Sequence, residues 1–373
     1  MKIMLLFTEA EEGVTGLLDP YCSPGFIEAL LDEDLEPVLV RFLHDGLRAP
    51  TMSQESTGGP PGPVSRCDAR SFGTLLQTHR PAIVQTFGDI ARLAPVWRAA
   101  AEAGCRVVHF VPGKAGDQMA AGKIRRAAWS RGGLNGRRSS RYVSAVLGSN
   151  RASIAKHLEA GFFPQAKFTM TTLPPIAVPA GRETWSPPPD SATAVLGCCQ
   201  HDGADEDIRF VLDAITLTGT RHLFRVLVFQ RSVSAAAKSP HDRNVAFLTA
   251  DSVGDLIQAI DVLIVPRNDD RAMEAVLLAL RSNKIVIAPD GGTVAEALQF
   301  GRHGVLFNAG SAFDLAMAID KTTGALSGPP FDFAGTDSVI GSARPQEVAR
   351  VFARAYRKLQ GQAGPRLETV AAQ

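Results

Sequence analysis

The sequence lacks the features that mark several large classes of protein. No hydrophobic run approaches the roughly 20 residues needed to cross a bilayer. Lys and Arg total 39 against 38 Asp and Glu, so the basic excess typical of dedicated nucleic-acid-binding proteins is missing. Five cysteines, two of them adjacent, do not form the framework of a disulfide-stapled secreted protein. The sequence also has no G-x-x-x-x-G-K-[ST] loop and no G-x-S-x-G turn, which are the signatures of P-loop nucleotide binding and of the hydrolase nucleophile elbow.

What is present is an ordinary globular composition with a strong alternation of patterns. Hydrophobic residues make up 45% of the 373 residues and charged residues 21%, a balance that excludes a largely disordered chain and suggests two domains. Strands are predicted at residues 1–7, 36–42, 82–85 and 106–110, with helices at 26–31, 71–78 and 94–103. The run at residues 1–7 has the character of a buried strand and not of a signal peptide.

The alternation restarts in the C-terminal half. Six further strands are predicted at residues 192–198, 223–230, 245–249, 261–266, 285–288 and 304–307, with helices at 205–217, 252–260, 270–282, 293–300 and 312–321. Repeated strand–helix–strand order favours parallel sheets with right-handed crossovers. We therefore predict an α/β protein with two Rossmann-like doubly wound domains that face a central cleft.

A proline-rich connector divides the two halves. The segment from Leu173 to Ser191 contains six prolines, a composition typical of an extended, semi-rigid linker. The predicted boundaries are an N-terminal domain at 1–175, a hinge at 176–191 and a C-terminal domain at 192–340. Residues 341–373 are predicted to form a C-terminal helix, at 345–359, and a frayed tail.

Positive charge is concentrated in one segment. From Lys114 to Arg141 there are eight Lys or Arg and one Asp. A solvated loop is one interpretation of such a run. The other is contact between Lys123 to Arg141 and anionic lipid headgroups or a polyprenyl-phosphate acceptor, at about 1 kcal/mol per basic residue near the surface. No nucleic-acid-binding motif accompanies the charge, so we expect no nucleic-acid partner.

The most specific stretch of the chain lies between Ser252 and Asp320. A predicted strand ends at Pro266, Asp270 opens a helix, and the strand IVIAPD runs into GGTVAE at residues 291–296. A GVLF strand and a closing helix complete the order. This order resembles the donor-binding half of the retaining GT-B glycosyltransferases of family 4 (glycosyl transferases group 1), and residues 141–176 resemble the end of their N-terminal domain. The resemblance implies a GT-B fold, in which the C-terminal helix returns to the N-terminal domain.

The glycine turn and the acidic residue can be interpreted without the family. Gly291, Gly292 and Thr293 follow a strand and open a helix, where backbone N–H groups can point at a phosphate. The alternative is a simple turn in which Thr293 is the N-cap and Glu296 closes a capping box. The carboxylate of Asp270 could accept hydroxyl groups of a sugar near a helix start, or could only cap that helix.

Several positions depart from the family pattern. The family's second carboxylate, which the resemblance assigns to the nucleotide ribose, falls on Leu278, and Glu274, one turn earlier, is the candidate replacement. The family's basic pair, which neutralises the diphosphate leaving group, is also missing, because no Lys or Arg occurs between Arg182 and Arg209. Since transfer depends on that neutralisation, we predict substitutes among the arginines that follow C-terminal strands or open helices, namely Arg231, Arg267 and Arg271.

The resemblance implies transfer of a sugar, with retention, from a UDP- or GDP-linked donor to a glycan or lipid-linked acceptor. The expected catalytic residues are Asp270 and Glu274, and no cofactor or obligatory metal is expected. The expected donor-binding residues are Gly291, Gly292, Thr293, Glu296, Arg267, Arg271, Arg231, Phe247 and Thr249. The expected acceptor side includes Gly13, Gly16 and His109. The departures favour an alternative, a degenerate GT-B protein that acts as a binding or partner subunit. We expect a cytoplasmic location, with peripheral contact to the inner membrane through the basic segment.

Overall fold

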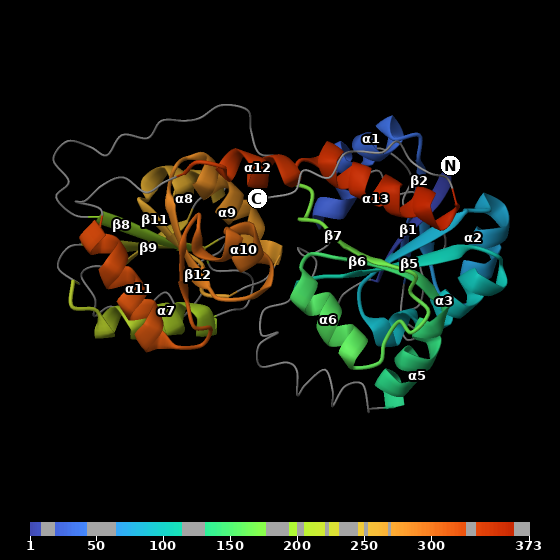
Figure 1. Ribbon diagram of the computed structural model, residues 1–373, viewed down its shortest axis with the longest axis horizontal. Helices are drawn as coiled ribbons and strands as arrows, with labels where there is room; N and C mark the ends of the chain where they lie inside the picture. Colours follow the sequence, from blue (N-terminus) through green and yellow to red (C-terminus); the bar gives the residue numbers. More distant parts are fainter. Residues whose placement is uncertain are drawn as a thin grey trace. The chain divides into compact units, whose positions relative to one another are not determined.

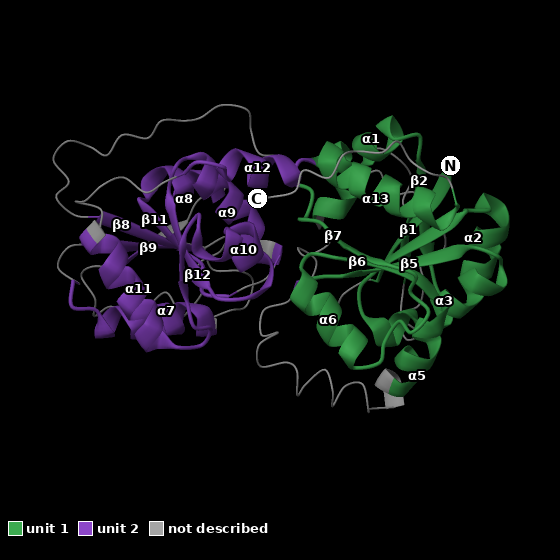
Figure 2. Cartoon of the chain, viewed as in Figure 1, with its two compact units in different colours: residues 1–112, 121–175, 345–373 green, residues 113–120, 176–344 purple. Residues whose placement is uncertain are grey.

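A computed structural model describes residues 1–8, 19–42, 65–113, 131–176, 194–199, 205–220, 224–230, 245–249, 253–267, 270–325 and 333–361 (Figure 1). The chain divides into two compact units (Figure 2). Unit 1 contains residues 1–112, 121–175 and 345–373, and unit 2 contains residues 113–120 and 176–344.

Unit 1 is built on a parallel sheet of seven strands in the order β3-β2-β1-β4-β5-β6-β7. The strands are β1 (Lys2–Thr8), β2 (Glu36–Phe42), β3 (Ser65–Cys67), β4 (Ile83–Phe87), β5 (Arg106–Val111), β6 (Val143–Gly148) and β7 (Thr169–Thr171). Their apolar runs fit a sheet that is covered on both faces. The direction of strand order changes between the neighbours β1 and β4, which is where doubly wound sheets bind ligands.

Helices cover both faces of this sheet. They are α1 (Pro24–Asp32), α2 (Phe72–His79), α3 (Ile90–Glu102), α5 (Arg131–Ser139), α6 (Arg151–Glu159) and α13 (Pro345–Leu359), with the 3₁₀ helices η2 (Asp19–Cys22) and η3 (Ser140–Tyr142). Alternate residues of β1 enter different cores. Leu5 packs with α1 and α13, whereas Leu6 packs with α2, α3 and α6.

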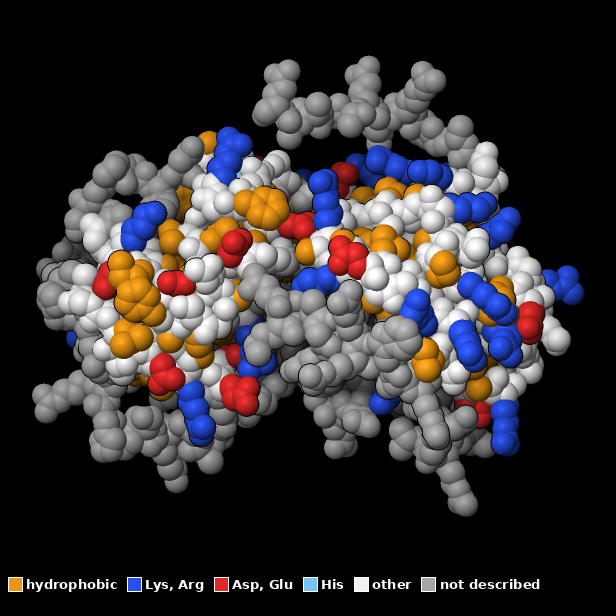
Figure 3. Space-filling model, turned by 60° about the horizontal axis from the view of Figure 1, so that its bottom comes forward, with side chains coloured by type: hydrophobic (Ala, Val, Ile, Leu, Met, Phe, Trp, Pro, Cys, Tyr) orange, Lys and Arg blue, Asp and Glu red, His pale blue; other side chains and the backbone are white. Residues whose placement is uncertain are grey.

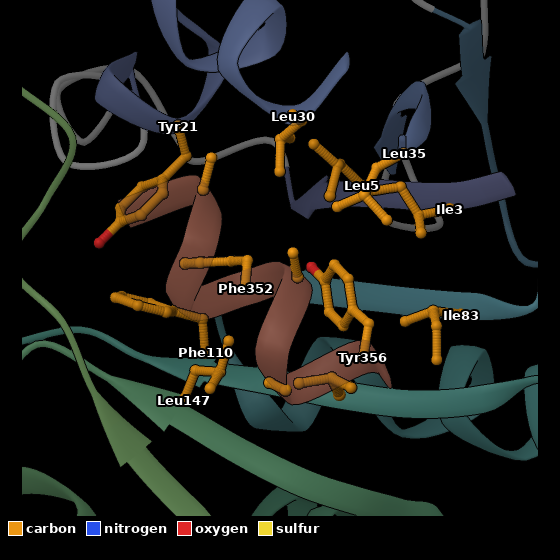
Figure 4. Packing of buried hydrophobic residues seen from close by; sticks show 14 of the residues in the cluster. Ile3, Leu5, Tyr21, Leu30, Leu35, Ile83, Phe110, Leu147, Phe352 and Tyr356 are labelled. Carbon is orange, nitrogen blue, oxygen red and sulfur yellow. The ribbon is translucent and has the colours of Figure 1, made fainter. Parts of the chain in front are cut away.

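The last helix of the chain completes the core of unit 1. The rings of Phe352 and Tyr356 on α13 lie among Tyr21, Phe110 and other apolar residues of the N-terminal half (Figure 4). The Tyr356 hydroxyl donates to Oε1 of buried Gln85 at 3.2 Å. An apolar stripe on α13 is thus buried by residues more than 200 positions earlier in the sequence.

Unit 2 is built on a parallel sheet of six strands in the order β10-β9-β8-β11-β12-β13. The strands are β8 (Ala194–Cys199), β9 (Phe224–Gln230), β10 (Val245–Thr249), β11 (Val262–Ile264), β12 (Ile285–Pro289) and β13 (Val305–Phe307). The helices are α7 (Asp205–Leu217), α8 (Val253–Ala259), α9 (Met273–Arg281), α10 (Gly292–Ala297), α11 (Ala312–Ala325) and α12 (Thr336–Ser342), with η6 (Asp270–Ala272) and η7 (Gln299–Gly301). Its switch point lies between β8 and β11.

Both units are doubly wound parallel α/β structures, as predicted from the alternation. The main local differences concern helices. Helix α3 begins at Ile90 and not at residue 94, because the Asp89 side chain caps it by accepting from the N–H of Ala91, and Pro95 is tolerated inside. The interpretation of the basic segment as a loop is wrong for residues 131–142, which form α5 and η3. The single helix predicted at 293–300 is two elements, α10 and η7.

Candidate functional site

The candidate site lies at the carboxyl edge of the unit 2 sheet. Strands β11 and β12 are parallel neighbours, with Ile264 opposite Ile287. The N–H of Val265, just past β11, still bonds to the carbonyl of Ile287 at 2.8 Å. The segments that follow the two strands therefore leave the sheet side by side, and they carry Asp270 and the glycine turn.

Asp270 is held by donors from two different segments. Its Oδ1 accepts the hydroxyl of Thr293 at 2.8 Å, and its Oδ2 accepts the N–H of Gly113 at 3.0 Å. The N–H of Asp270 in turn donates to the Gly113 carbonyl at 3.1 Å. Asp270 is 5% exposed and Thr293 is fully buried. Because buried charges are costly unless hydrogen-bonded, these contacts favour a carboxylate held in one fixed orientation.

The glycine turn has backbone angles that favour glycine. Gly291 has φ 91° and Gly292 has φ 72°, values that L side chains rarely adopt. Gly291 is the N-cap of α10, so the alternative in which Thr293 caps this helix is wrong. The Thr293 hydroxyl is directed to Asp270 instead. Glu296 is half-buried on α10.

Arg267 forms an ion-pair cluster at the switch point. It follows β11, and its guanidinium binds the carboxylates of Asp207 and Glu206 at the start of α7, which follows the neighbouring strand β8. The Asp207 side chain is 6% exposed, whereas the Glu206 side chain is 88% exposed and lies 3.3 Å from Arg267. The predicted substitute for the family's basic pair is therefore already paired with two acidic residues.

The other predicted donor residues are placed differently. Glu274 is exposed on α9 and Leu278 is half-buried there, in contrast to the buried Asp270. Arg271 belongs to η6, and Phe247 and Thr249 belong to β10, but the positions of their side chains are not described. Three predicted residues lie outside the described part of the chain, namely Arg231, Gly13 and Gly16.

His109, predicted on the acceptor side, is buried in the core of unit 1. It is 1% exposed and its ring packs against Trp97 and Phe163. Its Nδ1 lies 3.1 Å from the hydroxyl of Thr86, which also accepts the indole N–H of Trp97 at 3.0 Å. This environment favours a structural histidine whose ring is hydrogen-bonded inside the core, and not a residue that contacts the acceptor substrate.

Two features of the sites were missed from the sequence. The first is Gly113, since nothing in its surroundings indicates a partner 157 residues away. The second is Gly88 at the unit 1 switch point, with φ 122°; a Cβ there would lie 1.9 Å from Oγ1 of Thr8. The signal for it was weak, because the strand was predicted to end at residue 85, whereas Gly88 directly follows the observed end of β4 at Phe87, a position where glycine allows close backbone approach.

Two kinds of feature are absent from the described residues. No group of three or more His, Cys, Asp or Glu is arranged to hold a metal ion in the part of the chain that the structure describes. Among the helices it describes, none has the length and apolar character needed to span a membrane.

Two doubly wound units of this kind define the GT-B class of glycosyltransferase folds. No protein-family model and no curated protein matches the sequence. Among solved structures, the chain is similar to the lipopolysaccharide outer core galactosyltransferase WaaB, with a TM-score of 0.69, 13% identity, and 96% of this chain and 100% of that chain covered. It is similar to WaaG, a glycosyltransferase of lipopolysaccharide biosynthesis, with a TM-score of 0.59 and 16% identity over 94% of this chain and 99% of that chain. It is also similar to HepE of Anabaena in complex with UDP-glucose, with a TM-score of 0.56 and 16% identity over 97% of this chain and 98% of that chain. These similarities establish the fold.

Proposed function

We propose that this chain is a retaining glycosyltransferase that moves a sugar from a nucleotide-sugar donor to a glycan or lipid-linked acceptor. The observation that carries the proposal is the buried Asp270 carboxylate, fixed beside the Gly291–Gly292 turn at the carboxyl edge of a doubly wound sheet. Ligands of such sheets bind at this edge. The resemblance to family 4 and the UDP-glucose complex of HepE support a nucleotide sugar as the donor.

In this proposal the two features have different roles. Asp270 accepts hydroxyl groups of the donor sugar and orients the anomeric carbon, which is a positioning contribution to catalysis. The Gly291–Gly292 turn lets a phosphate approach the backbone closely, since neither residue has a Cβ. Transfer proceeds without an obligatory metal, so full activity in excess chelator is expected.

The diphosphate requires positive charge, and we assign Arg267 to it. Glu206 is the exposed member of its ion-pair cluster, and exposed pairs contribute only about 0–1 kcal/mol. A diphosphate can therefore replace Glu206 on the guanidinium at little cost, while Asp207 continues to hold the other side of the group.

We also propose peripheral contact with an anionic membrane. Arg138 and Arg141, at the end of the basic segment, are exposed, as is Arg98 on the neighbouring α3. Figure 3 shows Lys and Arg side chains gathered on the surface of unit 1. Binding to acidic vesicles at low salt, release by added salt and no binding to neutral vesicles are expected, because exposed charges are screened.

The test of the proposed function is calorimetry with UDP-glucose, UDP and GDP, followed by transfer assays with glycan and lipid-linked acceptors. Binding of a nucleotide sugar and a product of retained anomeric configuration are expected. Asp270→Asn should lower turnover much more than it lowers affinity for the bare nucleotide. Binding without turnover would indicate the binding-subunit alternative, and absence of nucleotide binding would overturn the proposal.

A further inference from the structure

We propose that Thr293 is a positioning residue for Asp270, and that its hydroxyl sets the orientation of the carboxylate that the donor sugar meets. The inference rests on the proposed function. It assigns Thr293 a role through another side chain, different from the phosphate contact that the sequence suggested for the turn.

The two oxygens of the Asp270 carboxylate accept from different donors. Thr293 donates to Oδ1 at 2.8 Å and Gly113 donates to Oδ2 at 3.0 Å, so each oxygen has a donor from a different segment. A carboxylate oxygen has about two acceptor directions. The donors on the two oxygens together fix the plane of the group.

The position of Thr293 in the chain supports a dedicated hydroxyl. Its side chain is fully buried, yet its hydroxyl does not cap α10, whose N-cap is Gly291. It reaches instead to a residue 23 positions away, on the segment after the neighbouring strand. A buried hydroxyl that only filled space could be replaced by a methyl group, as in valine, at little cost.

Loss of the Thr293 hydroxyl should lower the rate of sugar transfer. Without it, Oδ1 of Asp270 loses a donor that holds the carboxylate plane in its orientation toward the sugar. A hydrogen bond to a charged group is stronger than one between neutral groups, and its loss corresponds to a factor of about ten to a hundred. Because the contact aligns the sugar and does not touch the nucleotide, the loss should appear in kcat and not in affinity for UDP.

The experiment compares Thr293→Val with Thr293→Ser. Valine keeps the shape of threonine and removes the hydroxyl; serine keeps the hydroxyl and removes a methyl group. With UDP-glucose as the donor and the glycan or lipid-linked acceptor that the wild type glycosylates, Thr293→Val should lower kcat by about ten- to a hundredfold, with UDP affinity unchanged. Thr293→Ser should keep kcat within about twofold while its melting temperature falls, because a buried methyl is lost.

Thr322→Val is the matched control. Thr322 is also fully buried in unit 2, and its hydroxyl donates to the Ala318 carbonyl of α11 at 2.7 Å. This variant should keep the wild-type kcat whatever its stability. If Thr293→Val is fully active, or Thr293→Ser loses as much activity as Thr293→Val, the role of Thr293 is overturned and the proposed function stands. If the wild type binds no nucleotide sugar, the proposed function fails and this role fails with it.

Discussion

Lys284 immediately precedes β12, so it lies at the amino end of that strand, opposite the carboxyl edge that carries the candidate site. The residue is only 4% exposed. Burial lowers the pKa of its ammonium group from 10.5 to about 8, against the attraction of the Asp261 carboxylate. Between about pH 8 and 10.5 the unfolded chain therefore binds more protons than the folded protein. The stability of unit 2 should rise with pH across this window. Below it, Lys284 is charged in both states and the burial penalty is constant.

Lys284→Met removes the buried charge and keeps an unbranched apolar side chain. The depression of the pKa corresponds to about 3 kcal/mol. Near neutral pH the variant should be more stable than the wild type, and this net figure already includes the attraction between the ammonium group and Asp261. This advantage should shrink by about 3 kcal/mol as the pH rises to 10.5, because the wild type then folds with a neutral lysine.

The assay is urea unfolding followed by hydrogen exchange in peptides that cover β11 and β12. A local readout is needed because burial also raises the pKa of the Cys67 thiol in unit 1 from 9.0 to about 12, which makes stability fall over an overlapping pH range. The matched control is Lys321→Met on α11, where the lysine is exposed. A stability difference between Lys284→Met and wild type that stays constant from pH 7 to 10.5 would refute the reasoning.

Three further outcomes are expected. Glu206→Gln should tighten binding of UDP by about two- to fivefold, since a carboxylate that competes for Arg267 is removed. Asp213 is exposed further along α7, so Asp213→Asn should leave UDP affinity unchanged, and equal effects of the two variants would contradict the assignment of Arg267 to the diphosphate. Gly88→Ala should destabilise unit 1 by more than about 2 kcal/mol in urea unfolding, against about 1 kcal/mol for Gly104→Ala, which has open space around it. Phe352→Ala should cost unit 1 about 3–5 kcal/mol, and a loss below 1 would exclude α13 from its core.

The sheets were largely predictable because their strands are continuous apolar runs. Strand β12 begins at the predicted residue and ends one residue later. The end of α10 at Ala297 was not predicted, since the chain turns at Gln299 and Phe300, two non-glycine residues with φ 49° and 53°, and the nearest glycine, Gly301, comes only after them. Helix α5 was missed because its sequence is rich in glycine. It forms against α3, where the missing side chain of Gly136 lets Ile90 approach.

The site was predictable only in part. Asp270 and the glycine turn were assigned to one region through the resemblance to family 4, and the topology agrees, because they follow the neighbouring parallel strands β11 and β12. The bond from Thr293 to Asp270 was not predictable, since it depends on how two loops meet. For His109, the apolar neighbours in VVHFV indicate a buried strand, and its expected place on the acceptor side did not follow from that pattern.

Under the proposed function, the absence of the basic pair typical of family 4 enzymes need not remove positive charge from the donor site. Asp207 is nearly buried, so its bond to Arg267 holds the guanidinium in place, whereas Glu206 is in water and binds only weakly. A phosphate offers stronger charge-assisted hydrogen bonds than an exposed carboxylate. Arg267 can therefore exchange one partner without losing its position. One arginine anchored by an acidic residue would then supply part of the charge that the family takes from two basic residues, and the weaker neutralisation should appear as a lower affinity for the diphosphate, with the orientation of the sugar by Asp270 unaffected.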